Sequence, residues 1–112
     1  MAKLRRATDT DIERLLARWP GLPADYLAYL REVGWGTAPN GRHMIYGGPM
    51  SPDEVYPQLA GETNRVIIGD DMQGYCLAYD FAAGAYGEYS DFGKWEELGE
   101  DFNLAAYLTE TG

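Results

Sequence analysis

The stretch Val66-Ile67-Ile68-Gly69-Asp70-Asp71, followed by Gly74, decides the fold class of this chain. It opens with three consecutive apolar, β-branched residues, a pattern typical of a strand that is covered on both faces. We therefore expect residues 66–68 to form the central strand of a sheet. The glycines and aspartates at 69–74 predict a polar turn directly after that strand.

Beyond this turn the sequence changes to a period of two. Aromatic and apolar side chains occupy every second position from Tyr75 to Phe81, which predicts a strand with two different faces. The Ala-Ala-Gly segment at 82–84 predicts a hairpin loop, and residues 85–90 predict the strand that pairs with the first. This half of the chain therefore favours antiparallel pairing.

Upstream of the central strand the apolar spacing is helical. Thr8 and Thr10 each stand three residues before an acid, which is the capping-box pattern, and apolar residues follow at 12, 15, 16 and 19. The Pro-Gly pair at 20–21 should end this helix. Pro23 suits the first turn of a second helix, in which residues 26, 29, 30 and 33 repeat at helical spacing. Gly34 can end that helix in a left-handed conformation.

The remaining predicted elements are short. Residues 44–46 read as a strand closed by Gly-Gly-Pro at 47–49, and residues 51–54 form a helix start that Pro57 should interrupt. A last helix is expected from about Asp101. Tyr26 and Tyr29 should pack in the core with their hydroxyl groups in contact with water. The prediction is an α+β fold: one domain over residues 1–112, with a largely antiparallel β-sheet packed with N-terminal helices and a short C-terminal helix.

The compartment is predicted from features that the sequence lacks. The basic residues near the N-terminus have no apolar run behind them, and no stretch approaches the roughly 18 apolar residues of a membrane helix. We therefore expect a cytoplasmic protein. The single cysteine, Cys76, permits no intramolecular disulfide and supplies at most one metal ligand.

Charge is distributed unevenly along the chain. The net charge is −9, and residues 1–65 are balanced, whereas residues 66–112 carry ten acids against Lys94 alone. Such a negative field repels nucleic acid and anionic membranes, so neither is an expected partner. It favours a basic protein as partner. The alternative is that the acids form a solubilising surface with no specific role.

Four features together resemble one known family. They are the Leu-Pro-x-x-Tyr-x-x-x-Leu pattern at 22–30, the Gly34-Trp35-Gly36 exit from that helix, the apolar strand that ends in Gly-Asp at 69–70, and an acidic, aromatic C-terminal stretch. From about Ile12 to Leu108 the chain resembles the SUKH superfamily, which includes bacterial immunity proteins and the Smi/Knr cell-wall regulators of fungi. Many relatives leave the Leu-Pro helix through an Asn-Gly-Gly-like turn, which this chain lacks.

The resemblance implies a function. The resemblance to bacterial SUKH proteins implies that this chain is an immunity protein, which binds and neutralises a cognate intracellular toxin domain, such as a nuclease, in interbacterial competition. The toxin would be basic because it binds an anionic substrate, and the immunity protein would be a monomer when free. The alternative implied by the fungal relatives is a regulatory or scaffold module that binds other proteins. A third possibility is a small ligand-binding protein or an enzyme that uses the aromatic residues of the sheet.

The candidate toxin-binding surface combines aromatic residues with acids, because aromatic side chains anchor interfaces and charges at the rim steer association. The alternative is that Phe92 and Trp95 fold inward to cover the sheet. Trp35 likewise either covers the sheet or projects from a loop. The candidate contact residues are Asp70, Asp71, Glu88, Tyr89, Asp91, Phe92, Trp95, Glu96, Glu97, Glu100 and Asp101.

Catalytic motifs are not found in the sequence. His43 is the only histidine, and no serine or cysteine is placed by sequence to serve as its nucleophile. The Asp70-Asp71 turn lacks the alternating ligands and the closing glutamate of a calcium loop. No phosphate-binding glycine motif is present. We therefore expect no enzymatic activity, no cofactor and no metal.

Overall fold

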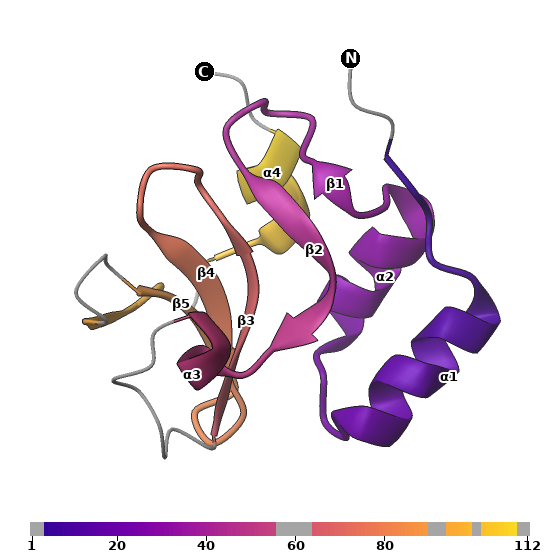
Figure 1. Ribbon diagram of the computed structural model, residues 1–112, viewed down its shortest axis with the longest axis horizontal. Coiled ribbons are helices and arrows are strands. Elements are labelled where there is room, and N and C mark those ends of the chain that lie inside the picture. The colour runs from indigo at the N-terminus through magenta and orange to yellow at the C-terminus, as the bar shows by residue number, and fades with distance from the viewer. Residues whose placement is uncertain (1–3, 56–63, 90–93, 100–101, 110–112) are drawn as a thin grey trace.

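The computed structural model describes residues 4–55, 64–89, 94–99 and 102–109, and an antiparallel sheet dominates it (Figure 1). Within these residues six strands follow one another in chain order, and each pairs with its successor. The predicted α+β class and the antiparallel pairing are confirmed. The strands are β1 (Gly36–Thr37), β2 (Met44–Met50), β3 (Arg65–Asp70), β4 (Cys76–Asp80), β5 (Ala85–Tyr89) and β6 (Trp95–Glu97).

The helices divide between the two faces of the sheet. The larger hydrophobic cluster joins α1 (Asp9–Arg18), α2 (Ala24–Glu32) and α4 (Leu104–Thr109) to one face. The short α3 (Pro52–Val55) packs on β3, and its Val55 contacts a smaller cluster on the opposite face (Figure 1). No helix in the described ranges is long and apolar enough to cross a membrane.

The predicted central strand is confirmed. Val66, Ile67 and Ile68 are all fully buried in β3, which has two strands on one side and three on the other. Val66 and Ile68 belong to the larger cluster, and Ile67 belongs to the smaller one. A strand that buries both faces needs apolar residues at consecutive positions, which is why this segment shows no alternation.

The first two helices begin and end close to the predicted positions. The Thr8 hydroxyl accepts the N–H of Asp11 at 3.1 Å, and the Asp11 carboxylate accepts the N–H of Thr8 at 2.9 Å, so the capping box is formed. Pro23 is the N-cap of α2, one position before the first turn in which it was expected. Gly34 has φ +110° and donates its N–H to the Tyr29 carbonyl at 2.9 Å, so its predicted role is confirmed.

Several boundaries differ from the predictions. β2 does not stop at Gly47-Gly48-Pro49 but continues through it with a register shift, and such an irregularity is where a strand can accommodate a proline, which has no N–H to donate. Tyr75 lies in the turn before β4. β1 and β6 were not predicted, since two or three residues are too few to show a period. α4 begins at Leu104, whereas Pro57, Ser90 and Asp101 lie outside the described residues.

Trp35 covers the sheet and does not project from a loop. It packs against the larger cluster, and its ring lies beside Gly47. The guanidinium carbon of Arg5 is 5.7 Å from the ring centroid. Trp35 therefore lies at the periphery of the larger hydrophobic cluster.

Tyr26 and Tyr29 pack in the core as predicted, but their hydroxyl groups are not in contact with water. Both hydroxyls are buried without a hydrogen-bond partner. Burial raises the pKa of Tyr26 and raises that of Tyr29 to about 12. An unsatisfied buried hydroxyl lowers the free energy of unfolding, because water would hydrogen-bond it in the unfolded chain.

Tyr26→Phe is therefore expected to raise the free energy of unfolding by about 1 kcal/mol. Urea unfolding followed by fluorescence would measure the change. Tyr86→Phe is the matched control, because the Tyr86 hydroxyl donates to Asp25 at 2.8 Å and its loss should be destabilising. Destabilisation by Tyr26→Phe would show that its hydroxyl has a partner.

Candidate protein-binding surface

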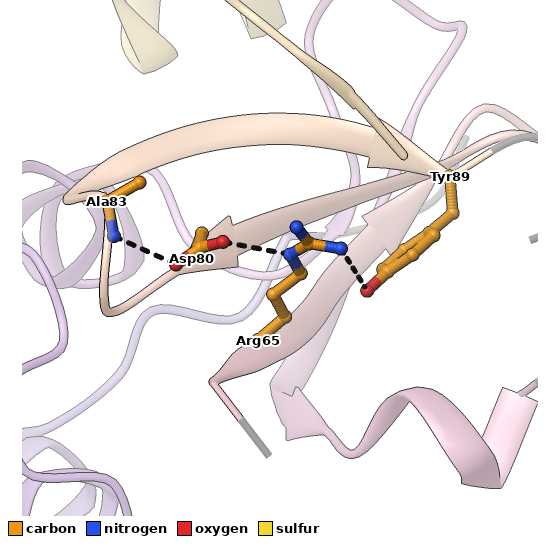
Figure 2. Close-up of polar contacts among 4 residues, drawn as sticks. All are labelled: Arg65, Asp80, Ala83 and Tyr89. Carbon is orange, nitrogen blue, oxygen red and sulfur yellow. Dashed lines mark hydrogen bonds and ion pairs between the residues drawn. The ribbon is translucent and has the colours of Figure 1, made fainter. Parts of the chain in front are cut away.

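Arg65 links strands on the face of the sheet that carries the smaller cluster. Its Nε donates to Oδ2 of Asp80 on β4 at 2.8 Å, and a terminal nitrogen donates to the Tyr89 hydroxyl on β5 at 3.4 Å (Figure 2). Oδ1 of Asp80 accepts the N–H of Ala83 at 2.9 Å, which closes the β4–β5 turn. The side chains of Arg65 and Asp80 are only 22% and 10% exposed.

Trp95 lies over this ion pair. The guanidinium carbon of Arg65 is 4.1 Å from the Trp95 ring centroid. The ring packs against Gly87 on β5, where any Cβ would overlap the indole. Trp95 thus folds inward to cover the sheet, which was the alternative to its predicted role in binding a partner. Tyr89 is 1% exposed, so the prediction that it contacts a partner is wrong: its ring fills the smaller cluster.

The acids of the predicted surface are spread over three places. Glu96 and Glu97 are exposed on β6, and Glu88 is half-buried on β5. Asp70 and Asp71 begin the β3–β4 turn. The other predicted contacts lie outside the described residues: Asp91, Phe92, Glu100 and Asp101.

The β3–β4 turn is held by the two aspartates. Oδ1 of Asp70 accepts the N–H of Met72 at 2.8 Å, and its Oδ2 accepts the Tyr46 hydroxyl at 2.6 Å. Oδ1 of Asp71 accepts the N–H groups of Gln73 and Tyr75 at 2.8 and 3.0 Å. Side-chain oxygens that bind the backbone two residues ahead stabilise turns. The turn is therefore held in one conformation.

This turn exposes apolar side chains. Met72 is 52% exposed and Tyr75 is 45% exposed, and the only other large hydrophobic residue exposed in the described ranges is Leu16 on α1. Met72 has φ +61°, which is unfavourable for a residue with a side chain. The sequence predicted the acids of this turn but assigned Tyr75 to a strand and gave Met72 no role. An apolar residue between Gly69 and Gly74, inside a predicted turn, was the available signal.

A cavity of about 400 Å³ adjoins the turn. Residues of the β1–β2 connection, the β3–β4 turn and α4 line it, and these three segments lie in the upper part of the view in Figure 1. Its lining residues are Gly41, Arg42, His43, Asp71, Met72, Gln73 and Tyr107.

His43, which lines this cavity, uses both ring nitrogens in a chain of hydrogen bonds. Oδ1 of Asn40 accepts the N–H of His43 at 3.2 Å, so the Asn40 amide nitrogen must donate to Nδ1 of His43, at 2.8 Å. Nε2 then carries the proton and donates to the Tyr107 hydroxyl at 3.1 Å. Tyr107 in turn donates to Glu88 at 3.2 Å. This chain joins α4 to the sheet and leaves no imidazole nitrogen to act as a base.

The electrostatics agree with neutral groups in this chain. Burial lowers the pKa of His43, and the negative charges of Asp71 and Glu88 oppose that shift only in part. Burial, followed by Glu88, raises the pKa of Tyr107 to about 12. Both side chains are therefore uncharged at pH 7. Sequence reasoning could not pair residues 43 and 107, because only the fold brings them together.

The described part of the chain holds no group of three or more histidine, cysteine, aspartate or glutamate side chains arranged to bind a metal ion. Comparison with protein-family models, with curated proteins and with solved structures found no match. A rigid acidic turn with exposed methionine and tyrosine side chains is suited to bind a protein surface.

Proposed function

We propose that this protein is an immunity protein, which binds a basic intracellular toxin domain and thereby neutralises it. The observation that carries the proposal is the turn from Asp70 to Tyr75. There Met72 and Tyr75 are exposed, and carboxylates hold the turn rigid. Apolar anchors that are already ordered lose little entropy on binding. The resemblance of the sequence to the SUKH superfamily supports the same function.

Charge supports a basic partner. The net charge of −9 comes from residues 66–112, and the exposed acids Glu96 and Glu97 extend it beyond the turn. Opposite charges on two proteins raise the association rate toward about 10⁸ M⁻¹ s⁻¹ or more at low salt. A standard interface covers about 800 Å² per partner, so it would use little more than a tenth of the 6635 Å² surface of this protein.

The proposed mode of action is binding without catalysis. His43 is committed to its hydrogen bonds with Asn40 and Tyr107. Inhibition would result from occupation of the toxin surface that its anionic substrate uses. In this proposal the protein acts in the cytoplasm, needs no cofactor and is a monomer until it meets the toxin.

A double substitution in the turn, Met72→Ser with Tyr75→Ser, is expected to weaken toxin binding at least about 10-fold, because each exposed anchor contributes about 1 kcal/mol or more. The chain would be co-expressed with the toxin domain encoded by the adjacent upstream reading frame, and growth would be measured. The intact chain should restore growth, and the double variant should restore less.

Leu16→Ser is the matched control, since Leu16 is also an exposed apolar residue (39%) but lies on α1, far from the turn (Figure 1). It should restore growth fully. Affinity of the purified proteins should fall when salt rises from about 0.1 to about 1 M, as the screening length shortens from about 10 to about 3 Å. Full rescue by the double variant would reject this surface. No rescue by the intact chain would reject the pairing and favour a scaffold role.

A further inference from the structure

A second cleft, of about 650 Å³, lies at the opposite end of β4 from the Asp70–Tyr75 turn. It opens between the start of α2, the β4–β5 hairpin and the segment after β6. Its volume is within the range of roughly 300–1,000 Å³ that is usual for ligand sites. Of the residues described for the candidate surface, only Ala83 and Glu97 line it.

Aromatic side chains line one part of this cleft. Tyr86 is central: its ring centroid is 5.2 Å from that of Tyr79 and 5.1 Å from that of Phe102. All three residues line the cleft and pack against the larger hydrophobic cluster. The aromatic surface is therefore held in place by the core.

Carboxylates line another part. Asp25 lies in the first turn of α2, and the Tyr86 hydroxyl donates to its Oδ1 at 2.8 Å. The positive end of the helix favours a negative charge there. Glu97 contributes a second, exposed carboxylate from β6. Among the described residues, no lysine, arginine or histidine lines the cleft, and neither acid forms an ion pair.

We infer that this cleft binds the guanidinium group of an arginine side chain presented by the protein partner. A planar guanidinium can stack on an aromatic ring and donate two hydrogen bonds to one carboxylate. Asp25 and Glu97 supply the acceptors, and Tyr79, Tyr86 and Phe102 supply the rings. Lysine, a compact and strongly hydrated charge, matches such a surface less well. The identity of the partner rests on the proposed function, but the chemistry of the cleft does not.

The cleft can be tested without a partner. N-acetyl-arginine amide would be titrated into the ¹⁵N-labelled protein, and amide shifts would be followed by NMR. We expect saturable shifts at Gly84, Leu98 and Gly99, which line the cleft. The neutral isostere N-acetyl-citrulline amide should produce no such shifts, and N-acetyl-lysine amide should bind more weakly. Absence of saturable shifts up to about 50 mM arginine amide would overturn the inference. Equal binding of the citrulline compound would also overturn it, because loss of charge-assisted hydrogen bonds should lower the affinity about 10-fold or more.

Asp25→Asn with Glu97→Gln should weaken arginine amide binding at least about 10-fold, since the shape is kept and the charge is removed. The amide oxygen introduced at position 25 can still accept the Tyr86 hydroxyl. Asp53→Asn with Glu96→Gln is the matched control: Asp53 is also an exposed first-turn acid, and Glu96 is adjacent to Glu97 but does not line the cleft. Equal loss in both variants would show a general charge effect and overturn the inference.

The two proposals fail in different ways. If arginine amide binds but the intact chain does not restore growth of cells that express the toxin domain, the cleft proposal stands and the proposed immunity function is rejected. The other case is that the intact chain and the Asp25→Asn, Glu97→Gln variant restore growth of toxin-expressing cells equally well. The immunity function then stands, but the partner does not bind in the cleft, which contradicts the inference. Loss of rescue in that variant alone supports both.

Discussion

Asp80→Ala is expected to lower the free energy of unfolding by about 3 kcal/mol, because it removes the carboxylate that binds the Arg65 guanidinium inside a mostly buried cluster. The Asp80 carboxylate accepts Nε of Arg65 at 2.8 Å and the N–H of Ala83 at 2.9 Å. Both the ion pair across β3 and β4 and the turn to β5 would weaken. Thermal unfolding should show a melting temperature lower by roughly 10 °C.

The control for this change is Glu13→Ala, which removes an exposed acid from α1. It should change the free energy of unfolding by less than about 0.5 kcal/mol. In a double-mutant cycle, Arg65→Met with Asp80→Ala should cost less than the sum of the single changes, because each single change already removes the interaction between the two side chains. Additive costs would contradict the assigned role of the ion pair.

The same pair predicts a pH dependence. Burial raises the pKa of Asp80, but the hydrogen bonds from Arg65 and Ala83 lower it by more, so the folded-state pKa lies below the ordinary value of 3.8. A lowered folded-state pKa means that the carboxylate stabilises the fold above about pH 4, and that this contribution is lost as the pH falls through the folded-state pKa. Between pH 5 and pH 2 the intact protein should therefore lose more stability than Asp80→Asn. Parallel curves would contradict the prediction.

Gly34→Ala should be the second severe change, with a cost of about 3 kcal/mol. Gly34 has φ +110°, where a side chain is strained, and a Cβ there would lie 2.6 Å from the carbonyl oxygen of Arg5. That carbonyl accepts the N–H of Trp35 at 2.9 Å, and the N–H of Arg5 donates to the Trp35 carbonyl at 3.0 Å. The substitution should push the N-terminal segment away from the start of the sheet.

Gly41→Ala separates the cost of the positive φ from the cost of the contact with Arg5. Gly41 has φ +73°, but nothing lies within 4 Å of the position that its Cβ would take. It should cost only about 1 kcal/mol, the conformational part of the penalty. Chemical denaturation of both variants would measure the difference, which reports the contact with Arg5. Equal costs would show that the contact is relieved without penalty.

Elements with strong local signals were predicted from the sequence. The Thr8 capping box, the glycine at 34 and the β-branched run at 66–68 each have a cause within a few residues. The hairpin between β4 and β5 follows from alternation and a short turn. Short-range hydrogen bonding and hydrophobic periodicity are enough to specify such segments.

Elements that depend on distant neighbours were missed. β6 has three residues that pair with β5, and its Trp95 packs over Gly87 and stacks on Arg65, which lies three strands away on β3. β2 continues through Gly47-Gly48-Pro49 with a register shift against β3. No local period records either arrangement.

The candidate site divides in the same way. The sequence alone shows that residues 66–112 are acidic, since charge needs no fold to be counted, and this predicts a basic partner. Which aromatic residues face outward is a different matter, because alternation assigns a residue to a face but does not say what covers that face. Packing of the folded chain buries Tyr89 beneath Trp95 and leaves Met72 and Tyr75 exposed in the turn that Asp70 and Asp71 stabilise by hydrogen bonds. Burial is a property of contacts between segments far apart in the chain, so only the tertiary structure decides it.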